Sequence, residues 1–189
     1  MNEPKSWQIE PSEWTLFLDR DGVINQKLED TYVYSWSEFV FEEGVLESIP
    51  LLMQHFGRIV VVTNQQGIGK EEMTEADLHA IFEELQKAVV EAGGRIDGFY
   101  YCPHLASDRT CKCRKPQQGM AHQAKADFPA IDFTKSVMVG DALTDMEFGK
   151  RLGMKTVYIT NNRYFNETFP DLADIYLESL AEFTSLLVD

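Results

Sequence analysis

The stretch TLFLDRDG, from Thr15 to Gly22, decides the fold. It opens with four residues, TLFL, that lack apolar and polar alternation, which is typical of a strand buried on both faces of a parallel sheet. Asp19 and Asp21 follow directly, and side chains two apart on an extended chain point the same way. Ligands of open α/β sheets bind outside the carboxyl ends of the strands. The stretch therefore predicts a strand that delivers two carboxylates to one site, with Arg20 turned aside.

Strand-like and helix-like segments alternate along the rest of the chain, which predicts βαβ units. The further expected strands are Arg58 to Thr63, Gly98 to Cys102, Ser136 to Gly140, Lys155 to Ile159 and Asp174 to Leu177. The expected helices are about Val45 to Phe56, Glu75 to Ala92, Gly119 to Phe128, Leu143 to Leu152 and Leu180 to Val188. Pro50 predicts a late start or a kink in the first helix. The pattern favours an α/β fold with a mostly parallel sheet and helices on both faces.

Composition narrows the class of protein. The 189 residues suit a single domain, 1–189. The net charge of −14 disfavours binding to nucleic acid or anionic lipid. Neither a secretory leader nor an apolar run of membrane-spanning length is evident; the run from Ile59 to Val62 has only four residues. We expect a cytoplasmic monomer without a membrane or nucleic-acid partner.

Two other expected strands end in residues that suit the same site. VVVTNQQG closes with Thr63 and Asn64, and VMVGDALTD closes with Asp141, with Asp145 about one helical turn later. Neighbouring carboxylates repel each other unless a cation lies between them or one is protonated. Mg²⁺ prefers such oxygen ligands. The strand ends therefore predict a crevice with a divalent cation.

The segment CRKP supplies the positive charge that a phosphate ligand would need, through Arg114 and Lys115. A single aspartate after a strand is usually a turn residue or a helix cap. The ordered set of an aspartate pair, Thr-Asn, Lys-Pro and a second aspartate pair is much harder to reach by chance. The set predicts a phosphate-handling active site.

All three cysteines lie in CPHLASDRTCKC, with one of the four histidines. A disulfide between Cys111 and Cys113 would be strained, and three cysteines cannot all pair. Cys102, His104, Cys111 and Cys113 match a closed, structural Zn²⁺ shell. The alternative is three buried free cysteines and a surface histidine. The polar loop between the two pairs offers no core to bury them, which favours a zinc loop at 102–113.

Four motifs resemble those of the haloacid dehalogenase (HAD) superfamily, in the same order: LFLDRDGVIN, VVVTNQQGIG, CRKP and VMVGDALTD. The resemblance implies a three-layer, Rossmann-like HAD fold and phosphoryl transfer. Between the first two strands, QKLEDTYVYSWSEFVFEEG is too short for a large cap domain.

The resemblance also implies roles for the strand-end residues. Asp19 would be the nucleophile, and Asp21 would be the acid and base for the leaving group and for water. Asp19, Asp141 and the backbone carbonyl of Asp21 would hold Mg²⁺. Thr63 and Lys115 would bind the phosphoryl oxygens, where charge spreads in the transition state. Asp145 would orient Lys115 or bind through water.

Within the superfamily, a zinc loop that runs into CRKP resembles one branch. This branch contains the D-glycero-D-manno-heptose 1,7-bisphosphate 7-phosphatases of lipopolysaccharide precursor synthesis and the histidinol-phosphate phosphatases of histidine synthesis. The resemblance implies a small phosphorylated substrate in contact with Asn64, Arg114 and Tyr32. FVFEEGV and CRKPQQGM resemble the heptose enzymes, whereas the short zinc loop resembles the histidinol enzymes. Another sugar-phosphate phosphatase, or a zinc-stabilised binding module without catalysis, stays open as an alternative.

Overall fold

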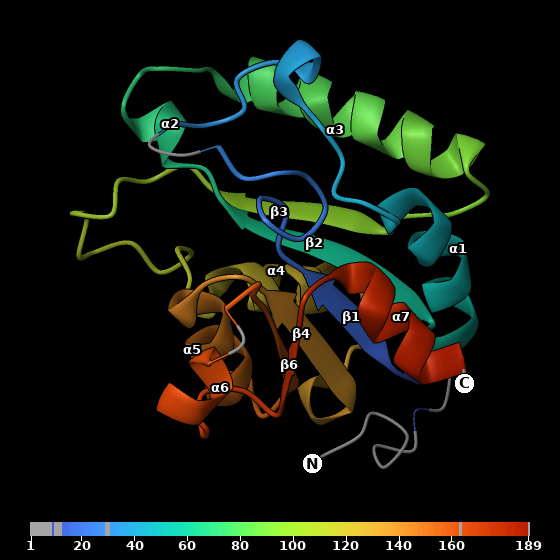
Figure 1. Cartoon of the computed structure of the whole chain (residues 1–189). Helices are drawn as coiled ribbons and strands as arrows, with labels where there is room; N and C mark the ends of the chain where they lie inside the picture. The colour runs from blue at the N-terminus through green and yellow to red at the C-terminus, as the bar shows by residue number, and fades with distance from the viewer. Residues whose placement is uncertain (1–8, 10–12, 29–30, 163, 189) are drawn as a thin grey trace.

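The computed structural model of this chain describes residues 9, 13–28, 31–162 and 164–188. The N-terminal segment, in which no secretory leader is expected, lies mostly outside these residues. Six parallel strands form one sheet in the order β3-β2-β1-β4-β5-β6 (Figure 1). They are β1 (Thr15–Leu18), β2 (Arg58–Asn64), β3 (Gly98–Cys102), β4 (Ser136–Gly140), β5 (Lys155–Ile159) and β6 (Ile175–Leu177). The predicted parallel α/β fold is confirmed.

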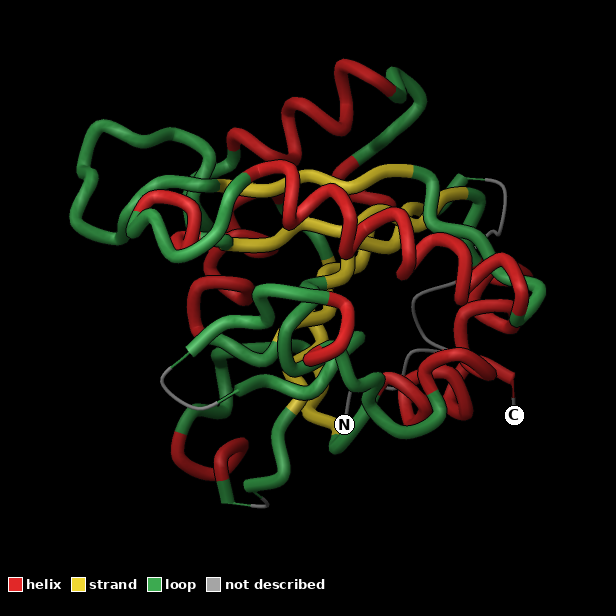
Figure 2. Tube along the Cα trace, turned by 90° about the horizontal axis from the view of Figure 1, so that it is seen from above, coloured by secondary structure: helices red, strands yellow, loops and turns green. Residues whose placement is uncertain are grey.

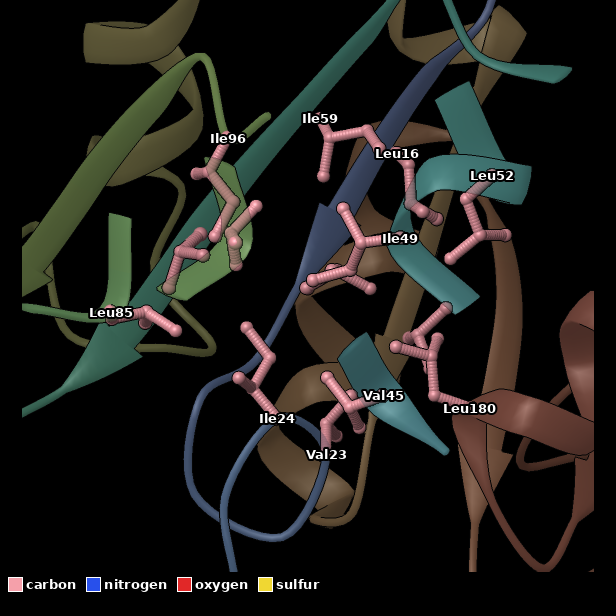
Figure 3. Packing of buried hydrophobic residues seen from close by; sticks show 14 of the residues in the cluster. Leu16, Val23, Ile24, Val45, Ile49, Leu52, Ile59, Leu85, Ile96 and Leu180 are labelled. Carbon is pink, nitrogen blue, oxygen red and sulfur yellow. The ribbon is translucent and has the colours of Figure 1, made fainter. Parts of the chain in front are cut away.

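Helices cover both faces of the sheet, as Figure 2 shows along the Cα trace. The helices are α1 (Val45–His55), α2 (Gln66–Gly69), α3 (Glu75–Glu91), α4 (Gly119–Asp127), α5 (Leu143–Leu152), α6 (Phe165–Thr168) and α7 (Leu180–Val188). Leu16 and Leu18 of β1 pack in a core with residues of α1, α3 and α7 (Figure 3), while Phe17 packs in another with residues of α4 and α5. The lack of alternation in β1 thus reflects burial on both faces.

Helix α1 starts where its expected range begins, so of the two effects predicted for Pro50, a late start or a kink, the late start does not occur. The helix begins at Val45, and the backbone N–H of Ser48 already donates to Gly44 O at 3.0 Å. Pro50 lies inside the helix, where it cannot donate a backbone hydrogen bond. Val45, Ile49 and Leu52 are buried on one side of α1, so packing against the core offsets that loss.

Two helices were not expected, α2 and α6, because four residues are too few to show a helical period. Between β1 and α1, the described residues form a loop and the 3₁₀-helix η2 (Trp36–Glu38), and no cap domain. A second 3₁₀-helix, η3 (Phe133–Lys135), precedes β4. Among the described helices, none is long and apolar enough to cross a membrane.

Because β1 is central in the sheet, we predict that Leu16→Ala lowers the free energy of unfolding by about 2 to 5 kcal/mol. Leu16 is 0% exposed, so its truncation leaves a cavity under α1. Leu51→Ala is the matched control, since Leu51 lies on α1 and is 39% exposed. This substitution should lower the free energy of unfolding by less than about 1 kcal/mol. Urea unfolding measures both variants. Equal losses would contradict the placement of β1 in the core.

Candidate active site

The candidate site lies at the carboxyl ends of β1, β2 and β4. These strands are neighbours, with Leu18 in register with Val61 on one side and Val139 on the other. The backbone N–H of Asp19 donates to Val139 O at 2.9 Å, which carries the β1–β4 pairing one residue beyond the strand. The sheet topology thus brings together the strand-end residues that lie far apart in sequence.

Lys115 is buried among acidic groups at the centre of the site. Its Nζ lies 2.9 Å from Asp19 Oδ1 and 2.8 Å from Asp145 Oδ1, and it donates to Val62 O at 2.8 Å. Burial and the nearby Asp145 carboxylate raise the pKa of Asp19 to about 7, although Lys115 acts in the opposite direction. Asp145 also accepts from the N–H of Ala142 at the start of α5, so its two oxygens hold Lys115 and the helix end together.

Asp21 lies among hydrogen-bond donors. The buried Arg20 guanidinium donates to it at 2.8 Å, Asn25 Nδ2 at 3.0 Å and Gln65 Nε2 at 2.9 Å. Burial alone would raise the pKa of Asp21, but Arg20, Asn25 and Gln65 together bring it below its usual value. The expectation that Arg20 simply turns aside is wrong: its long side chain folds back onto the neighbouring carboxylate.

Asp141 completes a group of three acids. One oxygen each from Asp19, Asp141 and Asp145 lies within 4.8 Å of the others. Asp141 Oδ2 accepts from Lys27 Nζ at 2.6 Å, whereas Oδ1 is buried and has no hydrogen-bond partner among the described residues. A buried carboxylate oxygen without a donor, beside a second carboxylate, suits a hard divalent cation.

Three consecutive side-chain amides after β2 connect the loops around the site. Asn64 Oδ1 accepts from the backbone N–H of Lys115 at 3.0 Å, and its Nδ2 donates to the carbonyl of Lys115 at 3.3 Å. Gln65 Nε2 reaches both Asp21 and Thr63 Oγ1, each at 2.9 Å. Gln66 donates to the Tyr32 hydroxyl and accepts from Ala106 N. The sequence analysis assigned no role in the site to Gln65 or Gln66, which stand directly after a strand end.

These groups border a cavity of about 450 Å³. Asn64, Arg114 and Tyr32, the three expected substrate contacts, all line it. Its other lining residues include Asp19, Asp21, Thr63, Asp141 and Asp145, together with Lys27 and Lys70, which the sequence reading did not single out. Lys115 is not part of the lining, but it pairs with Asp19, which is. The cavity lining thus combines the acidic group with basic side chains, of which Lys27 lies directly against Asp141.

The Cys and His residues of the 102–113 loop converge on one point. The distances between Cys102 Sγ, His104 Nδ1, Cys111 Sγ and Cys113 Sγ run from 3.0 to 3.5 Å. A point equidistant from four such atoms lies about 2 Å from each, close to Zn–N and Zn–S bond lengths of about 2.0 to 2.3 Å. The S···S distances are too long for a disulfide. All four donors come from protein, which fits a structural rather than a catalytic metal.

Comparison with known proteins places the chain in a family. Residues 112–183 match the family model described as HAD-hydrolase-like. D-glycero-alpha-D-manno-heptose-1,7-bisphosphate 7-phosphatase of Mycobacterium tuberculosis is 36% identical over 171 residues, which cover 90% of each chain. The corresponding beta-heptose enzyme of Escherichia coli K12 is 35% identical over 88% of this chain and 90% of its own. The chain belongs to the HAD-like hydrolases.

A solved structure agrees with the fold of this HAD-like hydrolase. The D,D-heptose 1,7-bisphosphate phosphatase from B. bronchiseptica, complexed with magnesium and phosphate, superimposes with a TM-score of 0.81. It is 31% identical and covers 92% of this chain and 97% of its own. The expected HAD fold without a large cap is confirmed, as is the expected enzyme class, a phosphoric monoester hydrolase.

We predict that Gly22→Ala impairs the hydrolase by about 10- to 100-fold, because it displaces a carboxylate that suits a metal. A Cβ on Gly22 would lie 2.4 Å from Asp141 Oδ2. Gly93→Ala is the matched control: Gly93 has a similar φ of +83°, against +85° for Gly22, but no atom within 4 Å of its Cβ position. Phosphate release and urea unfolding measure both variants.

Backbone strain at positive φ should cost both variants about 1 to 2 kcal/mol of unfolding free energy. Only Gly22→Ala should also lose activity. Equal activity in the two variants would contradict the position of Asp141.

Proposed function

We propose that this hydrolase is a Mg²⁺-dependent phosphomonoesterase that removes the 7-phosphate of a D-glycero-D-manno-heptose 1,7-bisphosphate. The observation that carries the proposal is a cavity lined by Asp19, Asp141 and Arg114, with the buried Lys115 ammonium 2.9 Å from Asp19 Oδ1. Such a cavity suits a substrate with one phosphate to cleave and a second negative group to bind. The 36% identity with enzymes named for this reaction supports the choice of substrate.

The proposed chemistry begins at Asp19. Its Oδ1 accepts from Lys115 Nζ and from the backbone N–H of Arg20, so Oδ2 is the atom left to attack phosphorus in line. A phosphorus–oxygen bond forms at Asp19 as the bond to the sugar oxygen breaks. Lys115 and the hydroxyl of Thr63 hold the phosphoryl oxygens during this transfer.

Asp21 would carry protons in both halves of the reaction. It protonates the leaving sugar oxygen and then deprotonates the water that cleaves the aspartyl-phosphate. Arg20, Asn25 and Gln65 favour its ionised form, which suits the second half. A substrate that binds as the phosphate monoanion supplies the proton for the first half.

The donor set supports a divalent cation beside Asp19. Asp19, Asp141 and the backbone carbonyl of Asp21 would hold Mg²⁺, which when bound neutralises charge between the carboxylates and the phosphoryl oxygens. The buried Oδ1 of Asp141, which has no hydrogen-bond partner in the described part of the chain, is the observation that supports this placement. Asp145 does not need to bind the ion, because both its oxygens already serve Lys115 and the N–H of Ala142.

A structural Zn²⁺ at Cys102, His104, Cys111 and Cys113 would position the cationic segment that follows. Arg114 comes next in the chain, its backbone N–H donates to Cys111 Sγ at 3.4 Å, and its guanidinium donates to His104 O at 3.5 Å. A metal that fixes the loop therefore also fixes Arg114 beside the cavity.

The proposed function is tested with a panel of phosphate esters. We expect kcat/KM for one or both anomers of heptose 1,7-bisphosphate to exceed that for fructose 1,6-bisphosphate and histidinol phosphate by at least about tenfold. Asp19→Asn should lower phosphate release from every ester by at least about 10³-fold without loss of fold. Asp171→Asn, an exposed aspartate outside the cavity, is the matched control.

Preferential turnover of histidinol phosphate would contradict the substrate and leave the phosphatase chemistry in place. Retained turnover in Asp19→Asn would contradict the mechanism.

For the zinc loop, we predict about one equivalent of zinc in protein purified without a chelator. Cys111→Ser and His104→Ala should each lower this content because they remove one of four ligands. His122→Ala is the control, since His122 is exposed on α4 and its ring lies against Phe133. Plasma mass spectrometry measures the metal. Less than about half an equivalent in the wild-type protein would count against the site.

A further inference from the structure

Lys27 lies at the edge of the acidic group and follows the predicted catalytic motif. Its Nζ is 2.6 Å from Asp141 Oδ2, while its side chain is 55% exposed. Lys27 and Asp141 are 114 residues apart in sequence, so the sheet topology alone brings them together. The contact joins a proposed metal ligand to a cation that has room to move.

The ion pairs of the acidic group, Asp19, Asp141 and Asp145, divide between two lysines. Lys115 pairs with Asp19 and Asp145. Lys27 is the cation that pairs with Asp141. Three carboxylates are thus balanced by two ammonium groups, one buried and one half exposed.

A divalent ion at Asp19 and Asp141 would change this balance. The ion brings two positive charges next to Asp141. The ion and the Lys27 ammonium group then repel each other, and Asp141 no longer needs Lys27 to balance its charge. Lys115 is held by three buried oxygens and cannot move away easily. Lys27 can move, because more than half of its side chain is in solvent.

We propose that Lys27 is a tethered counter-cation that competes with Mg²⁺ for Asp141. It stabilises the acidic group of the free enzyme and is released from Asp141 when the ion binds. Lys27 therefore sets the affinity of the site for Mg²⁺. This inference rests on the proposed metal site.

The first test is calorimetric titration of Mg²⁺ into protein dialysed against magnesium-free buffer without a strong chelator. We expect Lys27→Met to bind Mg²⁺ about three- to tenfold more tightly than the wild-type protein, because the competing charge is gone. Lys27→Arg should keep the wild-type affinity within about twofold, since it keeps the charge. Lys70→Met is the matched control: Lys70 lines the same cavity, but it lies over the Tyr32 ring and pairs with Glu72.

Each result of this titration has a definite meaning. Unchanged or weaker binding in Lys27→Met overturns the competition, and so does an equal gain in Lys70→Met. If the wild-type protein binds Mg²⁺ and Lys27→Met binds it with the same affinity, only this inference is overturned. Absence of Mg²⁺ binding in every variant overturns the metal site and this inference together.

A second measurement needs no variant. Acetylation of lysines by acetic anhydride, read by mass spectrometry, should modify Lys27 faster when Mg²⁺ is present, because the ion frees its amine from Asp141. Lys70 is the internal reference, and its rate should stay constant. Equal or slower modification of Lys27 with Mg²⁺ overturns the proposal even if Lys27→Met fails to fold.

Discussion

The buried ammonium of Lys115 is the interaction on which the rest of the site depends. A charge with a side chain only 1% exposed is stable only if opposite charges and hydrogen-bond acceptors surround it. Three oxygen-bearing groups meet this demand. Asp19 follows β1, the carbonyl of Val62 belongs to β2, and Asp145 lies in the first turn of α5. The same contacts fix the carboxylate of Asp19 relative to the sheet. Removal of one partner would leave an uncompensated buried charge, so the arrangement is rigid.

A second set of constraints comes from side-chain amides rather than charges. Asn64 holds the backbone of Lys115 through both of its polar atoms, which determines where that residue enters the site. Gln65 joins Asp21 to Thr63, and Gln66 joins Tyr32 to the loop of the Cys and His cluster. One short segment after β2 therefore connects the acids, the cavity wall and the candidate metal loop. Such a network keeps reactive groups in place without a large cap domain.

Much of the fold could be predicted because its signals are local. The apolar strand Thr15–Leu18 and the capped helix Glu75–Glu91 each show their period or burial within a few residues. Of the two effects predicted for Pro50, a late start or a kink, the late start does not occur, because the penalty at Pro50 is local while the gain comes from packing against distant residues. Helices α2 and α6 were missed because one turn leaves no periodic signal.

The sequence by itself determined the order of the strands along the chain and the chemical type of residue at each strand end. It also determined that Cys102, His104, Cys111 and Cys113 form a possible ligand set, because sequence spacing alone limits which pairs can be close. Only the tertiary structure decided that Arg20 binds Asp21 and that Lys27 reaches Asp141. These contacts depend on side-chain direction and on strands that are adjacent in the sheet but distant in sequence. An ion pair between residues that are far apart in sequence leaves no periodic pattern or motif in the sequence, so only the folded structure shows it.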